Sequence, residues 1–258
     1  MLNASPTRRR LINAYYASLK VVCPGLRNSQ FVYREALEEV VRPGIRWLDL
    51  GCGHQLFPDW MPDGLSAQLA LVNRCGGVFG VDAADFRPHA VGLEKVAADV
   101  EQLPFADETF SLVTANMVVE HVRNPERLLR EVRRVLAPGG LFLFHTPNAR
   151  YFEVAIARHM PAPVMKGVAS FLDGRGGDDI FPTHYRLNKA DDIRRLATKS
   201  GLVTRSIRHV ECTAQGVMLG PLVILELLVI RTLRLPIFED YRSDLLVVLE
   251  KPENGTLH

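Results

Sequence analysis

The first forty residues carry apolar side chains at helical spacing on both sides of a Pro24-Gly25 break. Apolar positions recur three or four residues apart over residues 11–22, and again over residues 31–41. This period predicts two amphipathic helices ahead of the first strand. Helices in that place either cap a crevice above a sheet or cover one of its faces, and the pattern favours neither arrangement.

Short apolar runs follow at intervals, and their length and β-branched content predict buried strands. The expected strands span residues 45–50, 78–82, 94–98, 112–115, 141–145, 202–210 and 245–250. Helical patterns separate several of them, at residues 65–75, 125–137 and 190–200. Alternation of this kind is typical of a parallel, doubly wound α/β sheet.

The helix after the fourth strand has a clear start signal in Asn124-Pro125-Glu126. Asparagine is a favoured N-cap, proline suits the first helical position, and an acid in the first turn faces the positive end of the helix dipole. The sequence Pro138-Gly139-Gly140 is expected to end this helix.

An unusually apolar run spans residues 217–230 and is interrupted only by Glu226. It is too short to cross a bilayer, which takes about 20 residues. The run is apolar nearly all round, so a buried helix or a dimer contact is the first expectation. The alternative is a lid that docks on lipid or closes over an apolar acceptor, helped by Arg231 and Arg234.

Length and composition are those of a globular protein. The 258 residues are 47% apolar and 23% charged, and no linker divides them. We therefore expect a single domain with an N-terminal helical cap over residues 1–42, a cofactor-binding core over 43–150 and acceptor-side segments over 151–258. The net charge of +2 is too small to indicate a nucleic-acid partner, and the basic cluster Arg8-Arg9-Arg10 lacks an accompanying aromatic or basic stripe.

The four cysteines show no C-x-x-C pair and no metal-like spacing. The N-terminal arginines are not followed by an apolar run, so a secretory signal is not expected. A reduced, cytoplasmic setting follows from both observations.

The stretch from Ile45 to His54 organises the rest of the chain. It reads as a buried strand that runs into a glycine turn, with Asp49 near the end of the strand. Gly51 and Gly53 lack a Cβ, so the turn can take positive φ and a ligand can approach its backbone. A carboxylate beside a bare backbone, at the edge of an α/β sheet where ligands bind, predicts a nucleotide-like cofactor site.

Two further acids follow strands at this edge, Asp82 after the second strand and Asp99 after the third. Either alone is more often a turn residue, because aspartate is common in turns. Their order and spacing favour a shared role with Asp49. A dinucleotide fingerprint is less well matched, since its third glycine falls on Leu56.

These motifs form an ordered set together with Leu103-Pro104-Phe105, Glu120-His121-Val122 and Leu136-x-Pro138-Gly139-Gly140. The set resembles the class I S-adenosylmethionine-dependent methyltransferases, most closely the type 11 group. The resemblance covers about residues 45–148 and weakens toward the chain end. It implies a Rossmann-like, mostly parallel seven-stranded sheet whose last strand is antiparallel.

Carried over by position, the resemblance implies roles for individual residues. The methionine end of the cofactor would lie against Asp49, Gly51, Cys52 and Gly53. Asp82 would accept hydrogen bonds from the ribose hydroxyls, and Asp99 with the Val100 N–H would read the adenine. Asn116 would line the methyl-transfer side. The chain departs from the family at Gln55, where many relatives have a third glycine.

Two histidines are candidates for a general base, because an unperturbed imidazole titrates near neutrality. His145 ends the fifth strand, and His184 lies in a segment that resembles the one before the family's late helix. Each could equally be a structural residue. Some related quinone methyltransferases carry a glutamate three residues before the Glu-His pair, where this chain has Met117, so we expect no metal site at Glu120-His121.

The sequence thus predicts transfer of a methyl group from S-adenosylmethionine to a small-molecule or lipid-linked acceptor, most simply an oxygen nucleophile. Two alternatives stay open: a dinucleotide-dependent oxidoreductase, and a non-catalytic binding or membrane-associated protein that retains the fold. Expected partners are the acceptor, a membrane surface touched through residues 217–230 and a second copy of the chain, with no nucleic acid. The expected location is the cytoplasm, including the inner face of a membrane.

Overall fold

A computed structural model describes residues 6–58, 60–83, 87–157, 182–213, 220 and 222–253. The chain divides into two compact units. One is drawn from residues 1–32, 148–182 and 209–244, and the other from residues 33–147, 183–208 and 245–258. The single domain expected from the sequence remains a prediction. Among the helices described, none is long and apolar enough to cross a bilayer.

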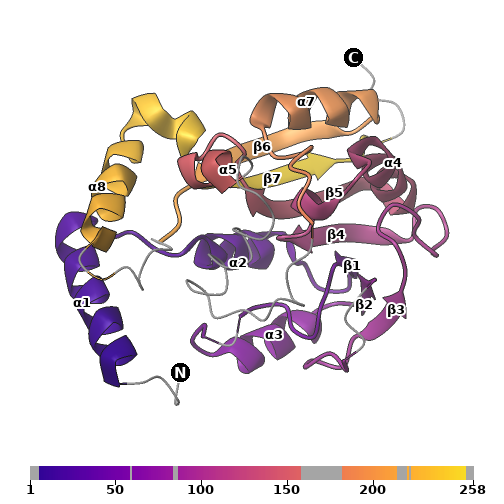
Figure 1. The fold of residues 1–258 in the computed structure, drawn as a ribbon. Coiled ribbons are helices and arrows are strands. Elements are labelled where there is room, and N and C mark those ends of the chain that lie inside the picture. Colours follow the sequence, from indigo (N-terminus) through magenta and orange to yellow (C-terminus); the bar gives the residue numbers. More distant parts are fainter. Residues whose placement is uncertain are drawn as a thin grey trace. The chain divides into compact units, whose positions relative to one another are not determined.

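A seven-stranded sheet forms in the order β3-β2-β1-β4-β5-β7-β6 (Figure 1). Its strands are β1 (Arg46–Leu50), β2 (Gly77–Asp82), β3 (Glu94–Ala97), β4 (Phe110–Asn116), β5 (Leu136–Pro147), β6 (Val203–Val210) and β7 (Asp244–Glu250). The first five run parallel. The chain order reverses between β1 and β4, and such switch points are where open α/β sheets bind ligands.

The last strand, β7, runs against β5. Gly139 N–H donates to the Lys251 carbonyl at 2.8 Å, and Asn148 N–H donates to the Ser243 carbonyl at 2.7 Å. Residue numbers rise along one strand as they fall along the other, which is the signature of an antiparallel pair. The predicted fold, a mostly parallel sheet with an antiparallel last strand, is confirmed.

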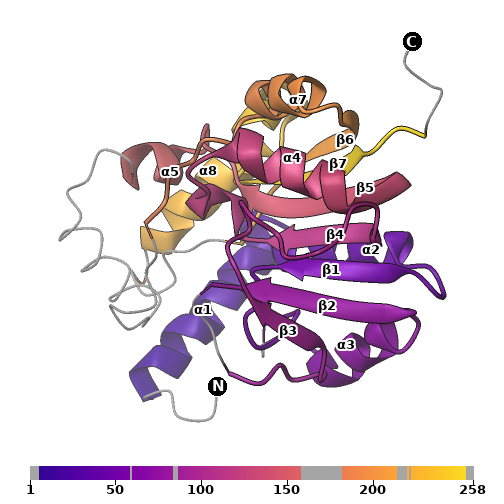
Figure 2. The ribbon, with the colours of Figure 1, turned by 90° about the vertical axis from the view of Figure 1, so that its right-hand side faces the viewer.

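Helices cover both faces of the sheet (Figure 2). On one face, α4 (Pro125–Val135) and α7 (Ala190–Lys199) lie side by side. On the other run α2 (Ser29–Val40) and α3 (Gly64–Val72). As predicted, Asn124 caps α4: its side chain accepts a hydrogen bond from the Arg127 N–H at 3.1 Å.

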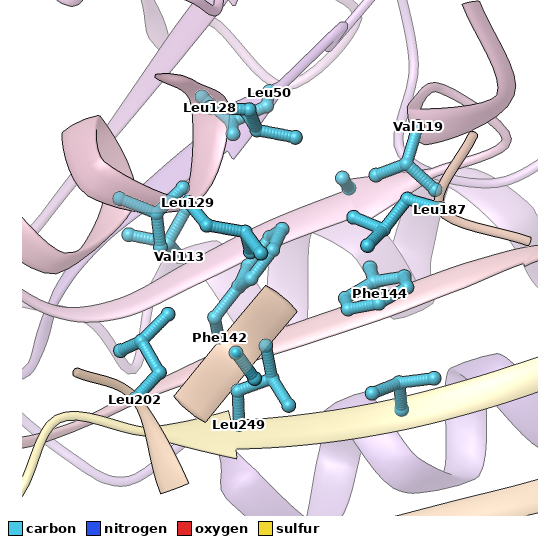
Figure 3. Close-up of a cluster of buried hydrophobic side chains, with 14 of the residues drawn as sticks. Leu50, Val113, Val119, Leu128, Leu129, Phe142, Phe144, Leu187, Leu202 and Leu249 are labelled. Atoms are coloured by element: carbon cyan, nitrogen blue, oxygen red, sulfur yellow. The ribbon is translucent and has the colours of Figure 1, made fainter. Parts of the chain in front are cut away.

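The main core lies between the sheet and α4 with α7. Strand residues such as Leu50, Val113 and Phe142 point toward leucines of α4 (Figure 3). Because side chains alternate along a strand, the intervening residues Trp47, Asp49 and Thr114 face the α2 side. This alternation places the polar residues of β1 and β4 away from the main core.

Among the boundaries that differ from the sequence expectation, two change the description of a predicted motif. The strand expected over residues 94–98 ends at Ala97, so Asp99 lies in the turn beyond it. Helix α4 ends at Val135, and Pro138-Gly139-Gly140 belongs to β5. The reason is that Leu136 already has extended backbone angles, φ −71° and ψ 134°, and Gly139 then turns the strand with φ +74°.

The other unit contains α1 (Pro6–Val22), α5 (Phe152–Ala157), α8 (Val223–Leu233) and the 3-10 helix η4 (Pro236–Tyr241). Val223, Leu227 and Ile230 of α8 are buried against Tyr15, Leu19 and Cys23. The outer face of α8 is apolar as well and is exposed, at Ile224, Leu225, Leu228 and Val229. The expected apolar run therefore forms a helix with one buried side, and its residues 217–219 and 221 lie outside the described residues.

Candidate functional site

Parallel strands bring their carboxyl ends to one edge of the sheet, and the predicted acids lie along that edge. Asp49 pairs in register with Gly80 of β2 and with Thr114 of β4, and Asp82 is the last residue of β2. The negative charge of Asp82 acts on Asp49, which shows that the two carboxylates share one neighbourhood. Two of the three expected acids therefore come together.

Asp49 is buried and belongs to a chain of hydrogen bonds. Its Oδ1 accepts from the Thr114 hydroxyl at 2.5 Å, and the Thr114 oxygen accepts from the Trp47 indole N–H at 2.7 Å. Burial raises the pKa of Asp49 to about 7, the Thr114 hydrogen bond opposes this rise, and the charge of Asp82 adds to it. A carboxylate held in this way is suited to meet a cationic group of a ligand.

The glycine turn is fixed from two sides. Gly53 N–H donates to Asp82 Oδ2 at 2.9 Å, and the Gly53 carbonyl accepts from Lys95 Nζ at 2.6 Å. Gly51 and Gly53 have φ of +63° and +53°, in the left-handed region that favours glycine. A Cβ on Gly51 would collide with the Val118 side chain, so packing as well as backbone shape requires glycine there.

A hollow of about 330 Å³ opens beside Asp82, at the edge of β2 and β3. Its wall carries basic side chains as well as the Asp82 carboxylate. It is lined by Asp82, Arg87, Pro88, His89, Gly92, Leu93, Lys95 and Ala97.

Asp99 and Val100 follow β3 in a turn. The Asp99 carboxylate accepts from the Glu101 N–H at 2.9 Å, which is the turn-forming role that the sequence left open. The Val100 side chain packs against the main core. Their adenine contacts remain a prediction.

A second polar group continues the edge at β4 and β5. Asn116 ends β4, and its Oδ1 lies 3.0 Å from His145 Nδ1. The His145 ring is almost fully buried and stacks on Tyr33 of α2, with 5.8 Å between ring centroids and 20° between planes. The Tyr33 phenol also faces Asp49 and Thr114, and burial together with the Asp49 charge raises its pKa.

Tyr33, Thr114 and Trp47 were not anticipated as site residues. The sequence shows Tyr33 only as one apolar position of a helical pattern and Trp47 only as strand bulk. The hydroxyl of Thr114, between the apolar residues Leu112, Val113 and Ala115, was the available signal.

His184 is placed differently from His145. Its backbone N–H donates to the Glu120 carbonyl at 2.7 Å, and its side chain is partly exposed. Glu120 is buried, and its Oε2 accepts from the Thr146 hydroxyl at 3.1 Å. Through these contacts Glu120 joins the segment at His184 to β5. No group of three metal-binding side chains occurs among the residues that the structure describes.

Comparison with known families matches residues 27–207 to the family described as a methyltransferase domain. The chain belongs to the methyltransferase family. Its seven-stranded sheet, with a glycine turn after the first strand and acids at the carboxyl edge, identifies it as a class I, S-adenosylmethionine-dependent member.

Curated relatives match parts of the methyltransferase. The mitochondrial 2-methoxy-6-polyprenyl-1,4-benzoquinol methylase of Rattus norvegicus is 33% identical over 102 residues, which is 40% of this chain and 31% of that protein. Malonyl-[acyl-carrier protein] O-methyltransferase of Methylococcus capsulatus is 29% identical over 148 residues, 55% and 54% of the two chains. The methyltransferase spans between about a third and a half of these relatives' lengths.

A solved S-adenosylmethionine dependent methyltransferase from Mesorhizobium loti shares the fold. The TM-score is 0.53 at 20% sequence identity, over 84% of this chain and 96% of that one.

The residues of the site suit the cofactor of the family. A buried carboxylate at Asp49 complements an ammonium group, and the Asp82 carboxylate can accept hydrogen bonds from hydroxyls. Burial raises the pKa of the Cys52 thiol to about 12, so Cys52 stays a neutral thiol that packs under the turn. Cys52 is therefore unsuited to act as a nucleophile, and its place beside the cofactor remains a prediction.

Proposed function

We propose that this methyltransferase transfers the methyl group of S-adenosylmethionine to an oxygen of a small-molecule or lipid-linked acceptor. The observation that carries the proposal is the polar group Asp49, Thr114, Tyr33, Asn116 and His145, which is buried or half-buried along one sheet edge. These side chains pair with one another by hydrogen bonds, as Asp49 does with Thr114 and Asn116 with His145, and they lie at the edge where folds of this class bind ligands.

Each side of this group has its own task in the proposal. Asp49 and the glycine turn bind the amino-acid end of the cofactor, and Asp82 accepts from the ribose hydroxyls. The cofactor supplies an electrophilic methyl group on sulfur. The protein therefore needs mainly to align the acceptor oxygen with it and to keep water away.

His145 is the favoured base in this proposal. Asn116 Oδ1 only accepts hydrogen bonds, so its contact with His145 Nδ1 puts the ring proton on Nδ1 and the lone pair on Nε2. Nε2 can then take the proton that an acceptor hydroxyl loses. His184 is partly exposed and is held through its backbone, so we give it the smaller role of lining the acceptor side.

The acceptor class is suggested by the relatives, which are named for a polyprenyl benzoquinol and a malonyl carrier protein. An apolar acceptor tail also agrees with the exposed outer face of α8. We propose that this face, Ile224, Leu225, Leu228 and Val229, touches the cytoplasmic surface of a membrane. A dimer through the same face is the competing use.

The reaction is tested by incubating the protein with methyl-labelled S-adenosylmethionine and extracts that contain quinols, phenols or lipids. The expected result is a labelled product heavier by one methyl group and bound through oxygen. Label found only on nitrogen or carbon would overturn the choice of oxygen. Calorimetry with S-adenosylhomocysteine and with NAD tests the cofactor, and binding of NAD alone would overturn the proposal.

Membrane contact is tested by flotation with vesicles of phosphatidylcholine and phosphatidylglycerol. The substitutions Leu225→Asp and Leu228→Asp together should abolish flotation, because both side chains are more than 45% exposed on α8. Val203→Asp, at a comparably exposed apolar position on β6, is the matched control and should float as the wild type does. Equal flotation of all variants would remove the membrane proposal, and a dimer that the α8 variants convert to monomer would replace it.

A further inference from the structure

Three buried side chains on neighbouring strands form a directed chain of hydrogen bonds. Trp47 and Asp49 lie on the same face of β1, and Thr114 lies opposite Asp49 on β4. Trp47 and Thr114 are completely buried, and Asp49 is 6% exposed. The indole N–H, the hydroxyl and the carboxylate follow one another at 2.7 Å and 2.5 Å.

The chemistry of the three groups fixes the direction of this chain. An indole N–H can only donate, so the Thr114 oxygen accepts from Trp47. The hydroxyl has a single proton, and the short contact directs it to Asp49 Oδ1. A charged carboxylate accepts this proton more strongly than a neutral carboxyl does. The chain therefore favours the charged form of Asp49.

Other titratable groups lie around Asp49. Tyr33 faces it from α2, and Cys52 lies in the turn beyond β1. Asp82 at the end of β2 adds a like charge, and burial adds to this, so the pKa of Asp49 is raised to about 7. His145 on β5 stacks on Tyr33. The Thr114 hydrogen bond therefore stabilises the charged form of Asp49. Because the pKa of Asp49 is about 7, this effect changes the charge of Asp49 near physiological pH.

We propose that Thr114 is a positioning residue of the cofactor site, whose hydroxyl, directed by Trp47, keeps Asp49 charged and aimed at the amino group of the cofactor. The proposal rests on the proposed binding of the cofactor's amino-acid end by Asp49. It adds that cofactor affinity decreases as the pH is lowered below neutrality. The pH at which the affinity decreases is set by Thr114 and Trp47, which do not touch the cofactor.

The test is calorimetric binding of S-adenosylhomocysteine to the wild type, Thr114→Val and Thr114→Ser between pH 6 and pH 9. Valine keeps the shape and removes the hydroxyl, and serine retains the hydroxyl. If valine raises the pKa of Asp49 by about one unit, affinity relative to the wild type falls about ninefold at pH 6, about threefold at pH 7.5 and hardly at all at pH 9. Because the two proteins are compared at each pH, titration of the ligand itself cancels.

A second ligand separates positioning from a general structural effect. Methylthioadenosine has the adenosine and sulfur but lacks the amino-acid end. Thr114→Val should leave its affinity within about twofold of the wild type at every pH, since Asp49 has no amino group to bind there. An equal loss for both ligands, or a loss for S-adenosylhomocysteine that does not vary with pH, overturns the proposal.

Two further variants keep the result decisive. Thr114→Ser should restore the wild-type pH profile, and Trp47→Phe should shift it in the same direction as valine by a smaller amount. If Thr114→Val does not unfold cooperatively, Trp47→Phe carries the test, and an unchanged pH profile there overturns the proposal. A wild type that binds neither ligand would instead disprove the cofactor assignment, an outcome distinct from failure of the Thr114 role.

Discussion

The rings of Tyr33 and His145 lie nearly parallel, 5.8 Å apart, and join the helix before the first strand to the end of β5. Tyr33 is thereby in contact with the candidate base on one side and with the Asp49 neighbourhood on the other. One aromatic ring thus links the residue proposed as the base to the residues proposed to bind the cofactor.

The stack predicts a graded effect on turnover. His145→Ala should lower kcat by about 10²-fold or more for an alcohol acceptor, because the base is lost. Tyr33→Leu should lower kcat less, since the imidazole is present but no longer held by the ring. His145→Ala should bind S-adenosylhomocysteine with an affinity close to that of the wild type. His184→Ala serves as the comparison, and a larger loss there than in His145→Ala would reverse the assignment.

Asp82 is predicted to carry a large share of cofactor affinity. Asp82→Ala should weaken S-adenosylhomocysteine binding about 10- to 100-fold, because hydrogen bonds to a charged group are lost. Asp191→Asn, at an exposed carboxylate of α7 paired with Arg194, is the control and should bind as the wild type does. Unchanged affinity in Asp82→Ala, measured by calorimetry on a cooperatively folded protein, would contradict the ribose role.

Lys95 should influence the cofactor without binding it. Lys95→Met keeps the apolar stem but removes the ammonium that holds the Gly53 carbonyl. We expect affinity for S-adenosylhomocysteine to fall by about three- to tenfold, because the turn becomes freer before binding. Lys199→Met, which removes an exposed ion pair with Glu126, should have no such effect. Equal behaviour of the two variants would count against the turn-holding role.

Glu211 should make stability depend on pH. Its carboxyl group is buried, and burial with the nearby Asp244 charge raises its pKa to about 8. The pKa of the carboxyl in the unfolded chain is near its ordinary value of 4.5, so between pH 4.5 and pH 8 the folded state binds more protons than the unfolded state. The free energy of unfolding therefore falls as pH rises through this window.

Glu211→Gln should remove that dependence. Relative to the wild type, the variant should be more stable by roughly 2 kcal/mol at pH 9 and nearly equal at pH 5. Urea unfolding at the two pH values measures this difference. Glu239→Gln, at an exposed carboxylate paired with Arg242, should show no comparable change between the two pH values. A stability difference for Glu211→Gln that is the same at both pH values would refute the role of its charge.

The order of strands and helices was predictable because each buried element leaves an apolar run, as residues 46–50 and 136–147 do. Asp49, Asp82 and the two glycines could be found because they follow such runs directly. The end of α4 was placed too late, because Pro138-Gly139-Gly140 is a stop signal in a helix and equally a bend at the start of a strand.

Contacts across strands could not be read from the sequence. Thr114 and Asp49 are 65 residues apart in the chain, and only the register of β1 against β4 brings their side chains together. Tyr33 was hidden for a related reason, since its helical pattern shows that it is buried and does not show against which residue. Partners of this kind depend on tertiary packing, which local patterns do not encode.

The hydrogen bonds of Asp82 and Lys95 to Gly53 connect the turn after β1 to β2 and to β3, the outermost strand at one side of the sheet. A ligand that binds to the Gly53 turn would stabilise the arrangement in which these hydrogen bonds are formed. By linkage, local unfolding of β3 should be less frequent in the ligand-bound protein than in the free protein. Slower amide hydrogen exchange in residues 94–97 would show this difference. Ligand binding would then stabilise the outer strand β3 against local unfolding.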